Sequence, residues 1–263
     1  MSKKYDLQLI VRSIQYLLLE ELSTVFAKKE ILEDLLVVSF DDKYLHIFEN
    51  KNNRINITEI PHEESITDES KKGWSAYLRQ RKHLYEYIPT QLQGKKIISG
   101  GLYSDFSRIQ KEKGSIYSSE ESYICTIIHE FAHVYFNSVN PFYYADKDYN
   151  LSLLALSKKL FSGNEIENEY QIELNSLSEL SEIFSFCVEY SFAKKYAPRY
   201  FKKMNNYFTN DLDVLLKKEK EKDLTREDSV LSDSHTLSFV LGRLILEKYP
   251  RDWSKRLLKR TLI

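Results

Sequence analysis

Residues that form turns and disulfides are scarce in this chain. Its 263 residues include only 7 glycines, 5 prolines and 2 cysteines. Because glycine and proline mark tight turns, their scarcity argues against a many-stranded barrel and favours long helices. The two cysteines, Cys125 and Cys187, cannot build a disulfide framework, and both lie in apolar stretches. We therefore expect reduced, buried thiols, which favour a reducing compartment.

The chain also lacks an excess of charge of either sign and any long hydrophobic run. Lys and Arg total 38 against 39 for Asp and Glu, so the net charge of -1 gives no electrostatic reason to expect nucleic acid as a partner. No stretch approaches the roughly 18 apolar residues that a membrane span needs. Lys3 and Lys4, followed by apolar residues, loosely resemble the start of a signal peptide, but the charged residues Asp6 and Arg12 interrupt the apolar stretch. We expect a cytoplasmic protein; export without a cleaved signal would leave the same pattern.

The apolar periodicity indicates how the chain is organised. Apolar residues at helical spacing from Leu7 to Phe26 predict an amphipathic helix or helix pair that runs to about Leu36. Polar and apolar residues alternate within 44–57, and two asparagines interrupt the pattern. This predicts a β-hairpin. A strand is predicted at 94–102, and from Ser118 the pattern is helical almost to the end.

These elements predict an α+β fold that is predominantly helical and contains a small mixed sheet. Hydrophobic residues at 42 % and charged residues at 29 % are ordinary globular values. The length corresponds to between one and two domains of about 150 residues. We expect residues 1–95 to form an N-terminal helical and β-hairpin region and residues 96–263 to form the second domain.

One predicted helix carries a pattern with chemical meaning. Ser118 and Glu121 are spaced as a capping box, which predicts a helix start. His129 and His133 then lie one turn apart on the same face, where two imidazoles can bind one Zn2+. Glu130 follows the first histidine and can reach a water on the metal, which completes an HExxH arrangement of two ligands and a general base. The structural alternative is two histidines that only make hydrogen bonds on a helix face.

A catalytic zinc needs a third protein ligand, and no Gly-x-x-His continuation follows the motif. A glutamate from a downstream helix is the alternative. Glu182 lies in a strongly apolar stretch, where a carboxylate is costly unless it is paired or bound to metal. Glu179 is the other candidate ligand. Glu189, on the same helix face, is expected either to orient a histidine or to lie on the surface.

These residues resemble a known group of enzymes. His-Glu-Phe-Ala-His at 129–133, followed by Glu-Ile-Phe-Ser at 182–185, resembles the zincin metallopeptidases whose third ligand is glutamate, the gluzincin-like group. Within these the sequence is most similar to the catalytic domain of anthrax lethal factor and to the Mlc titration factor peptidases. The resemblance covers about residues 115–205, and HExxH is its one highly specific part.

The resemblance implies a zincin-like metallopeptidase domain at 96–263. It implies His129, His133 and Glu182 as ligands of Zn2+ and Glu130 as the general base. The implied function is zinc-dependent hydrolysis of a peptide or protein substrate. The alternative function is a degenerate zincin scaffold that binds zinc and a partner protein in a regulatory role without cleaving it. A fold without metal requires the HExxH match to be accidental.

Two departures from the family pattern leave open which residue stabilises the transition state. Phe186 stands one turn after Glu182, where relatives often keep an acidic residue. Asn175 stands where a chain like lethal factor would place a catalytic tyrosine. In many zincins a histidine or tyrosine outside the metal shell hydrogen-bonds the oxyanion, so His235 is a candidate catalytic donor, with Tyr170 and Tyr190 as weaker candidates. The structural alternative for His235 is a hydrogen-bonded or helix-capping residue.

Overall fold

The computed structural model divides the chain into two compact units, residues 1–135 and 136–263. The residues that the structure describes are 3–19, 22, 25–26, 36–40, 44–51, 54–61, 91–92, 95–103, 116, 118–139, 180–220 and 233–259. Whether residues 1–95 form a separate functional region stays a prediction.

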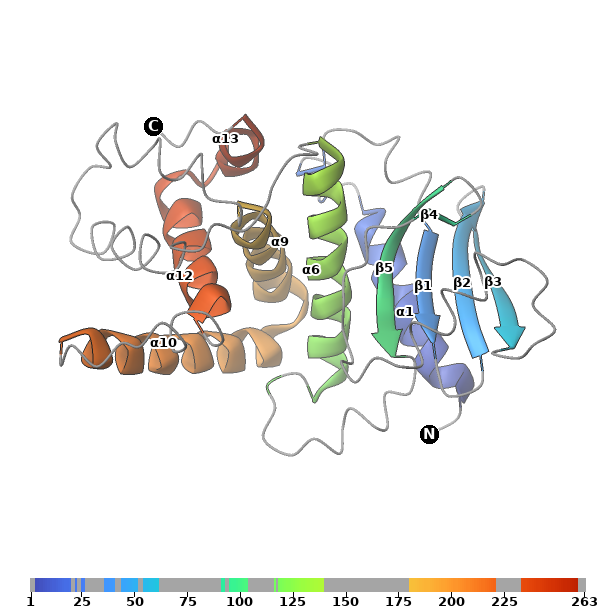
Figure 1. Ribbon diagram of the computed structural model, residues 1–263, viewed down its shortest axis with the longest axis horizontal. Helices are drawn as coiled ribbons and strands as arrows, with labels where there is room; N and C mark the ends of the chain where they lie inside the picture. Colours follow the sequence, from blue (N-terminus) through green and yellow to red (C-terminus); the bar gives the residue numbers. More distant parts are fainter. Residues whose placement is uncertain are drawn as a thin grey trace. The chain divides into compact units, whose positions relative to one another are not determined.

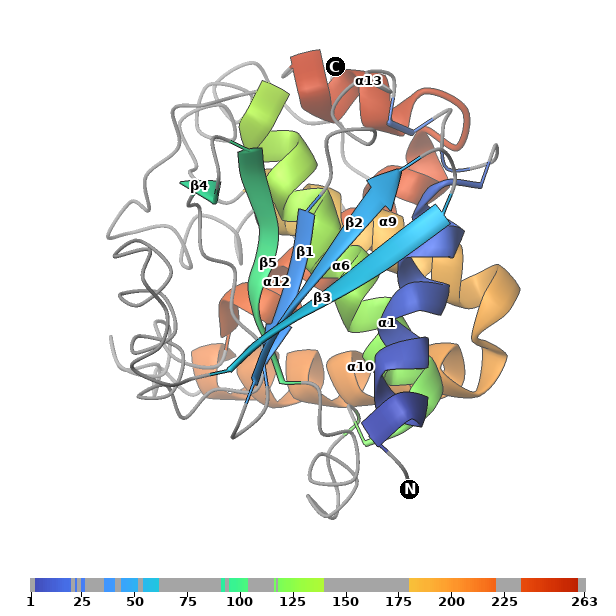
Figure 2. The ribbon, with the colours of Figure 1, turned by 90° about the vertical axis from the view of Figure 1, so that its right-hand side faces the viewer.

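A mixed β-sheet dominates the first unit. Its strands are ordered β3-β2-β1-β5-β4. Only the β1–β5 pair is parallel, and a register shift interrupts it between Val37 and Ser39. In Figure 2, helix α1 (Lys3–Leu17) and helix α6 (Glu120–Val139) lie behind this sheet, on the same face. The strand bounds are β1 Leu36–Phe40, β2 Tyr44–Lys51, β3 Arg54–Pro61, β4 Gln91–Leu92 and β5 Lys95–Tyr103.

The predicted hairpin and the predicted strand are both confirmed. β2 and β3 pair antiparallel along their whole length, with buried Phe48 opposite Ile57. His46 is fully buried in β2 opposite Glu59, with 3.7 Å between its Nδ1 and the carboxylate. The strand predicted at 94–102 is β5.

The N-terminal apolar pattern predicts a helix or a helix pair. Helix α1 covers Lys3–Leu17 and β1 begins at Leu36, and most of the chain between them, where a second helix is the alternative, lies outside the described residues. The adjacent β-branched Val37 and Val38 favour an extended conformation, which lets β1 pair with strands on both sides.

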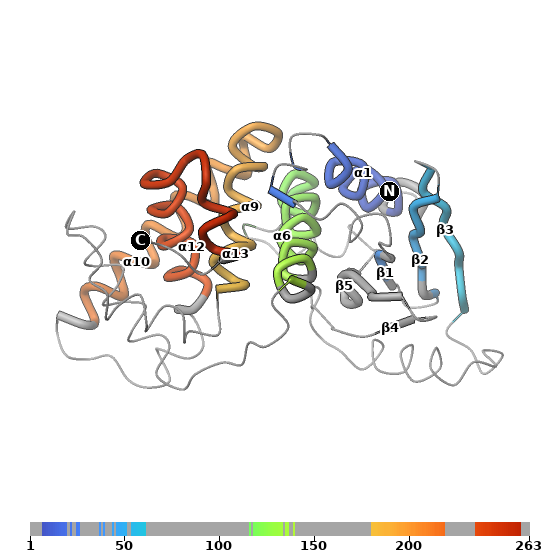
Figure 3. The backbone as a smooth tube through the Cα atoms, turned by 90° about the horizontal axis from the view of Figure 1, so that it is seen from above, coloured from blue at the N-terminus to red at the C-terminus, as the bar shows by residue number. Residues whose placement is uncertain are grey.

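The second unit is helical in the residues that are described. Figure 1 shows α9 and α12 side by side, with α10 running across their ends, and Figure 3 shows α13 beside them. Gly242 on α12 allows this close approach, because a Cβ there would lie 3.3 Å from both the Cys187 sulfur and the Ile183 carbonyl oxygen of α9. The helix bounds are α9 Leu180–Tyr196, α10 Pro198–Lys220, α12 Asp233–Lys248 and α13 Trp253–Lys259.

The fold therefore matches the predicted class in its coarse features. The described residues form mostly helices together with one small mixed sheet. None of the helices within the described ranges is both long and apolar enough to cross a membrane.

Candidate metal centre

Helix α6, Glu120–Val139, carries the HExxH sequence and begins at a reciprocal serine cap. The Ser122 backbone N–H donates to Ser119 Oγ at 3.1 Å, and the Ser119 backbone N–H donates to Ser122 Oγ at 2.9 Å. The N-cap is therefore Ser119, one residue later than the predicted Ser118. Serine at the third helical position makes the return bond that glutamate makes in the usual capping box, which the sequence prediction missed.

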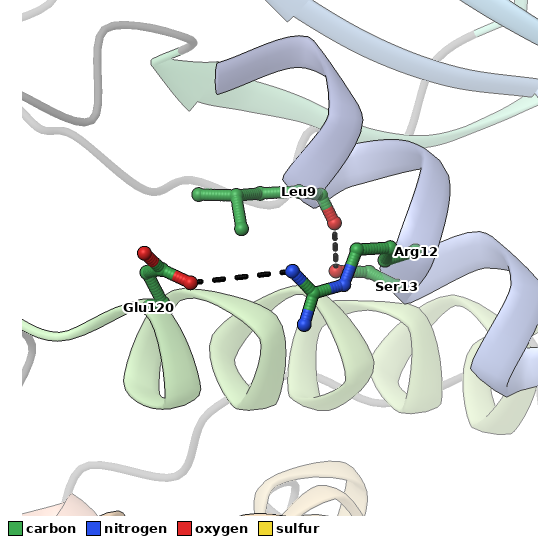
Figure 4. A network of polar contacts seen from close by, with 4 residues as sticks. All are labelled: Leu9, Arg12, Ser13 and Glu120. Carbon is green, nitrogen blue, oxygen red and sulfur yellow. Dashed lines mark hydrogen bonds and ion pairs between the residues drawn. The ribbon is translucent and has the colours of Figure 1, made fainter. Parts of the chain in front are cut away.

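Contacts with the N-terminal segment hold α6 in place within the first unit. Figure 4 shows the α1 side chain of Arg12 reaching Glu120 in the first turn of α6, at 4.0 Å. Further along α6, the Phe26 ring packs edge-on against Phe131 and Tyr135, with centroid distances of 5.1 and 4.8 Å. All three aromatic side chains are fully buried, so apolar packing fixes the helix close to the histidines.

The two histidines of the motif point at a common position. Their Nε2 atoms lie 3.1 Å apart, and their rings are nearly perpendicular at a centroid distance of 4.8 Å. A tetrahedral ion bonded to two nitrogens at 2.0–2.1 Å holds them about 3.3 Å apart, so the pair needs little movement to share one ion. His129 is buried and His133 is partly exposed, which leaves one side of the pair accessible.

Glu182 completes a group of three that could hold a metal ion. One ligand atom from each of His129, His133 and Glu182 lies within 4.8 Å of the others. Glu182 is in the first turn of α9. Every residue of this helix from Leu180 to Glu189 is buried. A carboxylate in such apolar surroundings needs a compensating charge, and a cation shared with two imidazoles supplies one. This donor set of two nitrogens and one oxygen fits a divalent transition metal such as zinc.

The structure also places the other predicted site residues. Glu130 follows His129 on α6 and is partly exposed. His235, in the first turn of α12, lies with Nε2 3.6 Å from Glu182 Oε1. Its side chain is 61 % exposed, whereas that of Glu182 is 10 % exposed, so His235 is the more accessible of the two. The alternative ligand Glu179 and the departure at Asn175 lie outside the described residues.

Glu189 contacts a residue that the sequence did not indicate. It accepts a 2.6 Å hydrogen bond from the hydroxyl of Tyr200 on α10, and both side chains are buried. With 19 tyrosines in the chain, no pattern singled out Tyr200. That Glu189 also orients a histidine stays a prediction, but a surface position for it is wrong.

Phe186 belongs to an aromatic cluster. Its ring packs edge-on against Phe208 of α10 and Phe239 of α12, and the latter two rings stack at 4.5 Å. His235 lies edge-on to the same Phe186 ring at 6.1 Å. Phe186 thus links the aromatic cluster to His235, the candidate catalytic histidine.

Both cysteines are buried, as predicted. The Cys187 thiol donates to the Gly242 carbonyl oxygen at 3.4 Å. Burial raises the pKa of this thiol well above its ordinary value, so it stays protonated at neutral pH. A protonated, buried thiol agrees with the expectation that Cys187 is reduced and buried.

No family profile matches the chain, and no similar protein is found among curated sequences or solved structures. The likeness to zincins therefore consists of the motif and of the group formed by His129, His133 and Glu182.

Proposed function

We propose that this protein is a zinc-dependent peptidase. The observation that carries the proposal is the convergence of the His129 and His133 Nε2 atoms, 3.1 Å apart, in one group with the buried Glu182 carboxylate. Two imidazoles and one carboxylate are the ligand set of a catalytic zinc site, which would keep a further position open for water or substrate. A structural site would be expected to use four protein ligands.

Each residue of the group has a defined part in the proposed reaction. His129, His133 and Glu182 would hold zinc, which when bound polarises a peptide carbonyl and lowers the pKa of water. Glu130 takes the proton from the attacking water and passes it to the leaving amine nitrogen. His235, exposed beside Glu182, donates a hydrogen bond to the substrate oxygen on which negative charge develops.

Glu130→Gln tests this mechanism, because it removes the base and leaves the three ligands in place. Zinc content, measured by elemental analysis of protein purified without chelator, should stay at one ion per chain. Cleavage of a mixed peptide library should fall by about 10²–10⁴-fold, the usual contribution of general acid–base catalysis. Glu121→Gln is the matched control, because it makes the same change near the start of α6. Full cleavage by Glu130→Gln with zinc retained would contradict the mechanism.

A zinc-binding scaffold is the second candidate function. The observation that favours it is Phe186, which lies in the aromatic cluster at the position where related peptidases often keep an acid. One zinc ion per wild-type chain, lost in Glu182→Gln and kept in the exposed control Glu247→Gln, would support metal binding in either function. Zinc binding without cleavage of any library peptide would favour the scaffold, and absence of bound zinc would exclude both functions.

A further inference from the structure

The turn that carries His235 is tied to a neighbouring helix by a short hydrogen bond. Thr236 Oγ1 donates to Asp211 Oδ2 of α10 at 2.5 Å. Thr236 is 1 % exposed and lies in the first turn of α12, next to His235 in the chain. A hydrogen bond to a carboxylate contributes more than one between neutral groups, so this contact helps to hold the first turn of α12 against α10.

The position of the His235 side chain depends on how the first turn of α12 is held, because neighbouring side chains contact only part of its surface. The edge-on Phe186 ring and the Glu182 carboxylate lie beside it, yet 61 % of the side chain is exposed. An exposed side chain exchanges rotamers freely unless its backbone and its contacts limit it. The 3.6 Å separation between His235 and Glu182 therefore depends on where the first turn of α12 is held.

We propose that Asp211 is a positioning residue of the metal centre, acting through Thr236 to hold His235 beside the Glu182 carboxylate. This inference builds on the proposed zinc site. Outer partners of metal ligands fix the orientation of those ligands, and their loss typically lowers metal affinity by about 10–100-fold. Asp211 thus contributes to zinc binding from α10, a helix that carries none of the three candidate ligands.

Paired variants of the full chain test the proposal with Zn2+ alone as the probe. Asp211→Ala and Thr236→Val remove the hydrogen bond, whereas Asp211→Asn and Thr236→Ser keep an acceptor and a hydroxyl. We expect the first pair to lower zinc affinity by about 10–100-fold and the second pair to stay close to wild type. Asp213→Ala is the matched control, since it removes a carboxylate from an exposed position on the same helix and should change nothing.

Two further measurements separate positioning from a purely structural role. The imidazole NMR signals of His235 in the metal-free chain should shift in Asp211→Ala and return towards wild type in Asp211→Asn. In a His235→Ala background, Asp211→Ala should cause no further loss of zinc affinity, because the residue through which it acts is gone.

Unchanged His235 signals and wild-type zinc affinity in folded Asp211→Ala or Thr236→Val would overturn the inference and leave the proposed zinc site intact. An equal loss with and without His235 would also overturn it. If the wild-type chain bound no zinc, the proposed function would fail instead. The NMR comparison would then still decide whether Asp211 positions His235.

Discussion

Tyr200 donates a 2.6 Å hydrogen bond from its hydroxyl to Glu189 Oε1, and both side chains are almost entirely buried. The contact joins α10 to α9, the helix that carries Glu182. If a buried carboxylate loses a hydrogen-bond donor, its lost hydration is no longer fully compensated, and the folded state is destabilised. This pair is thus a stabilising link within the helical unit, two helical turns along α9 from the candidate metal ligand.

Tyr200→Phe should lower the free energy of unfolding by about 1.5–3 kcal/mol, the usual range for a hydrogen bond to a charged group. Urea denaturation followed by circular dichroism measures it. Tyr207→Phe is the matched control, because Tyr207 is on the same helix but 50 % exposed, and its change should be within about 0.5 kcal/mol. Equal effects of the two variants on the free energy of unfolding would show that the buried hydrogen bond does not contribute to stability.

The cap of α6 distinguishes two neighbouring serines. Ser119→Ala removes the side-chain acceptor for the Ser122 backbone N–H and should destabilise the protein by about 1 kcal/mol. Ser118→Ala, at the N-cap position expected from the sequence, should have a smaller effect. Thermal unfolding of both variants measures the difference. The reverse order of stabilities would move the cap to Ser118.

Gly242 should resist substitution in spite of its helical position. Alanine gains about 1 kcal/mol of helix propensity, but its Cβ would lie 3.3 Å from the Cys187 sulfur and from a backbone oxygen. Overpacking typically costs about 1–3 kcal/mol, so we expect a net loss of stability in denaturant unfolding. Combining Gly242→Ala with Cys187→Ala should recover part of that loss, because one of the two close neighbours is removed. A more stable single variant would contradict this account of the α9–α12 contact.

The buried Cys187 thiol predicts how stability changes in mild alkali. Its pKa is raised by burial in the folded chain, whereas an unfolded thiol ionises near its ordinary value of about 8.5. Above that pH the unfolded state has lost a proton that the folded state retains, so the free energy of unfolding falls as pH rises. The slope approaches about 1.4 kcal/mol per pH unit.

Urea titrations between pH 7.5 and about 9 check this prediction in a range where most tyrosines remain protonated. Cys187→Ala should begin from a lower stability, since it removes a buried side chain, but its dependence on pH should be flatter than that of wild type. The same slope in both proteins would assign the alkaline loss to other groups.

Local sequence patterns were enough to indicate the helix of the candidate site and the residues of the group that could hold a metal ion. Helical periodicity and the one-turn spacing of His129 and His133 place both imidazoles on one face of α6, because that relation is local to a helix. The β2–β3 hairpin was predictable for the same reason, since alternating residues and a short connection are local signals. Glu182 was a candidate because a carboxylate in an apolar helix is costly unless it is compensated, although the sequence left Glu179 open as the alternative.

Contacts between residues far apart in the chain became visible in the folded structure alone. The parallel pairing of β1 with β5 joins strands that are distant in the sequence. The packing of His235 against Phe186, its 3.6 Å separation from Glu182 and the Thr236–Asp211 bond all join different helices. Such contacts follow from how helices pack, and a period of 3.6 residues shows which face is buried but not what lies against it.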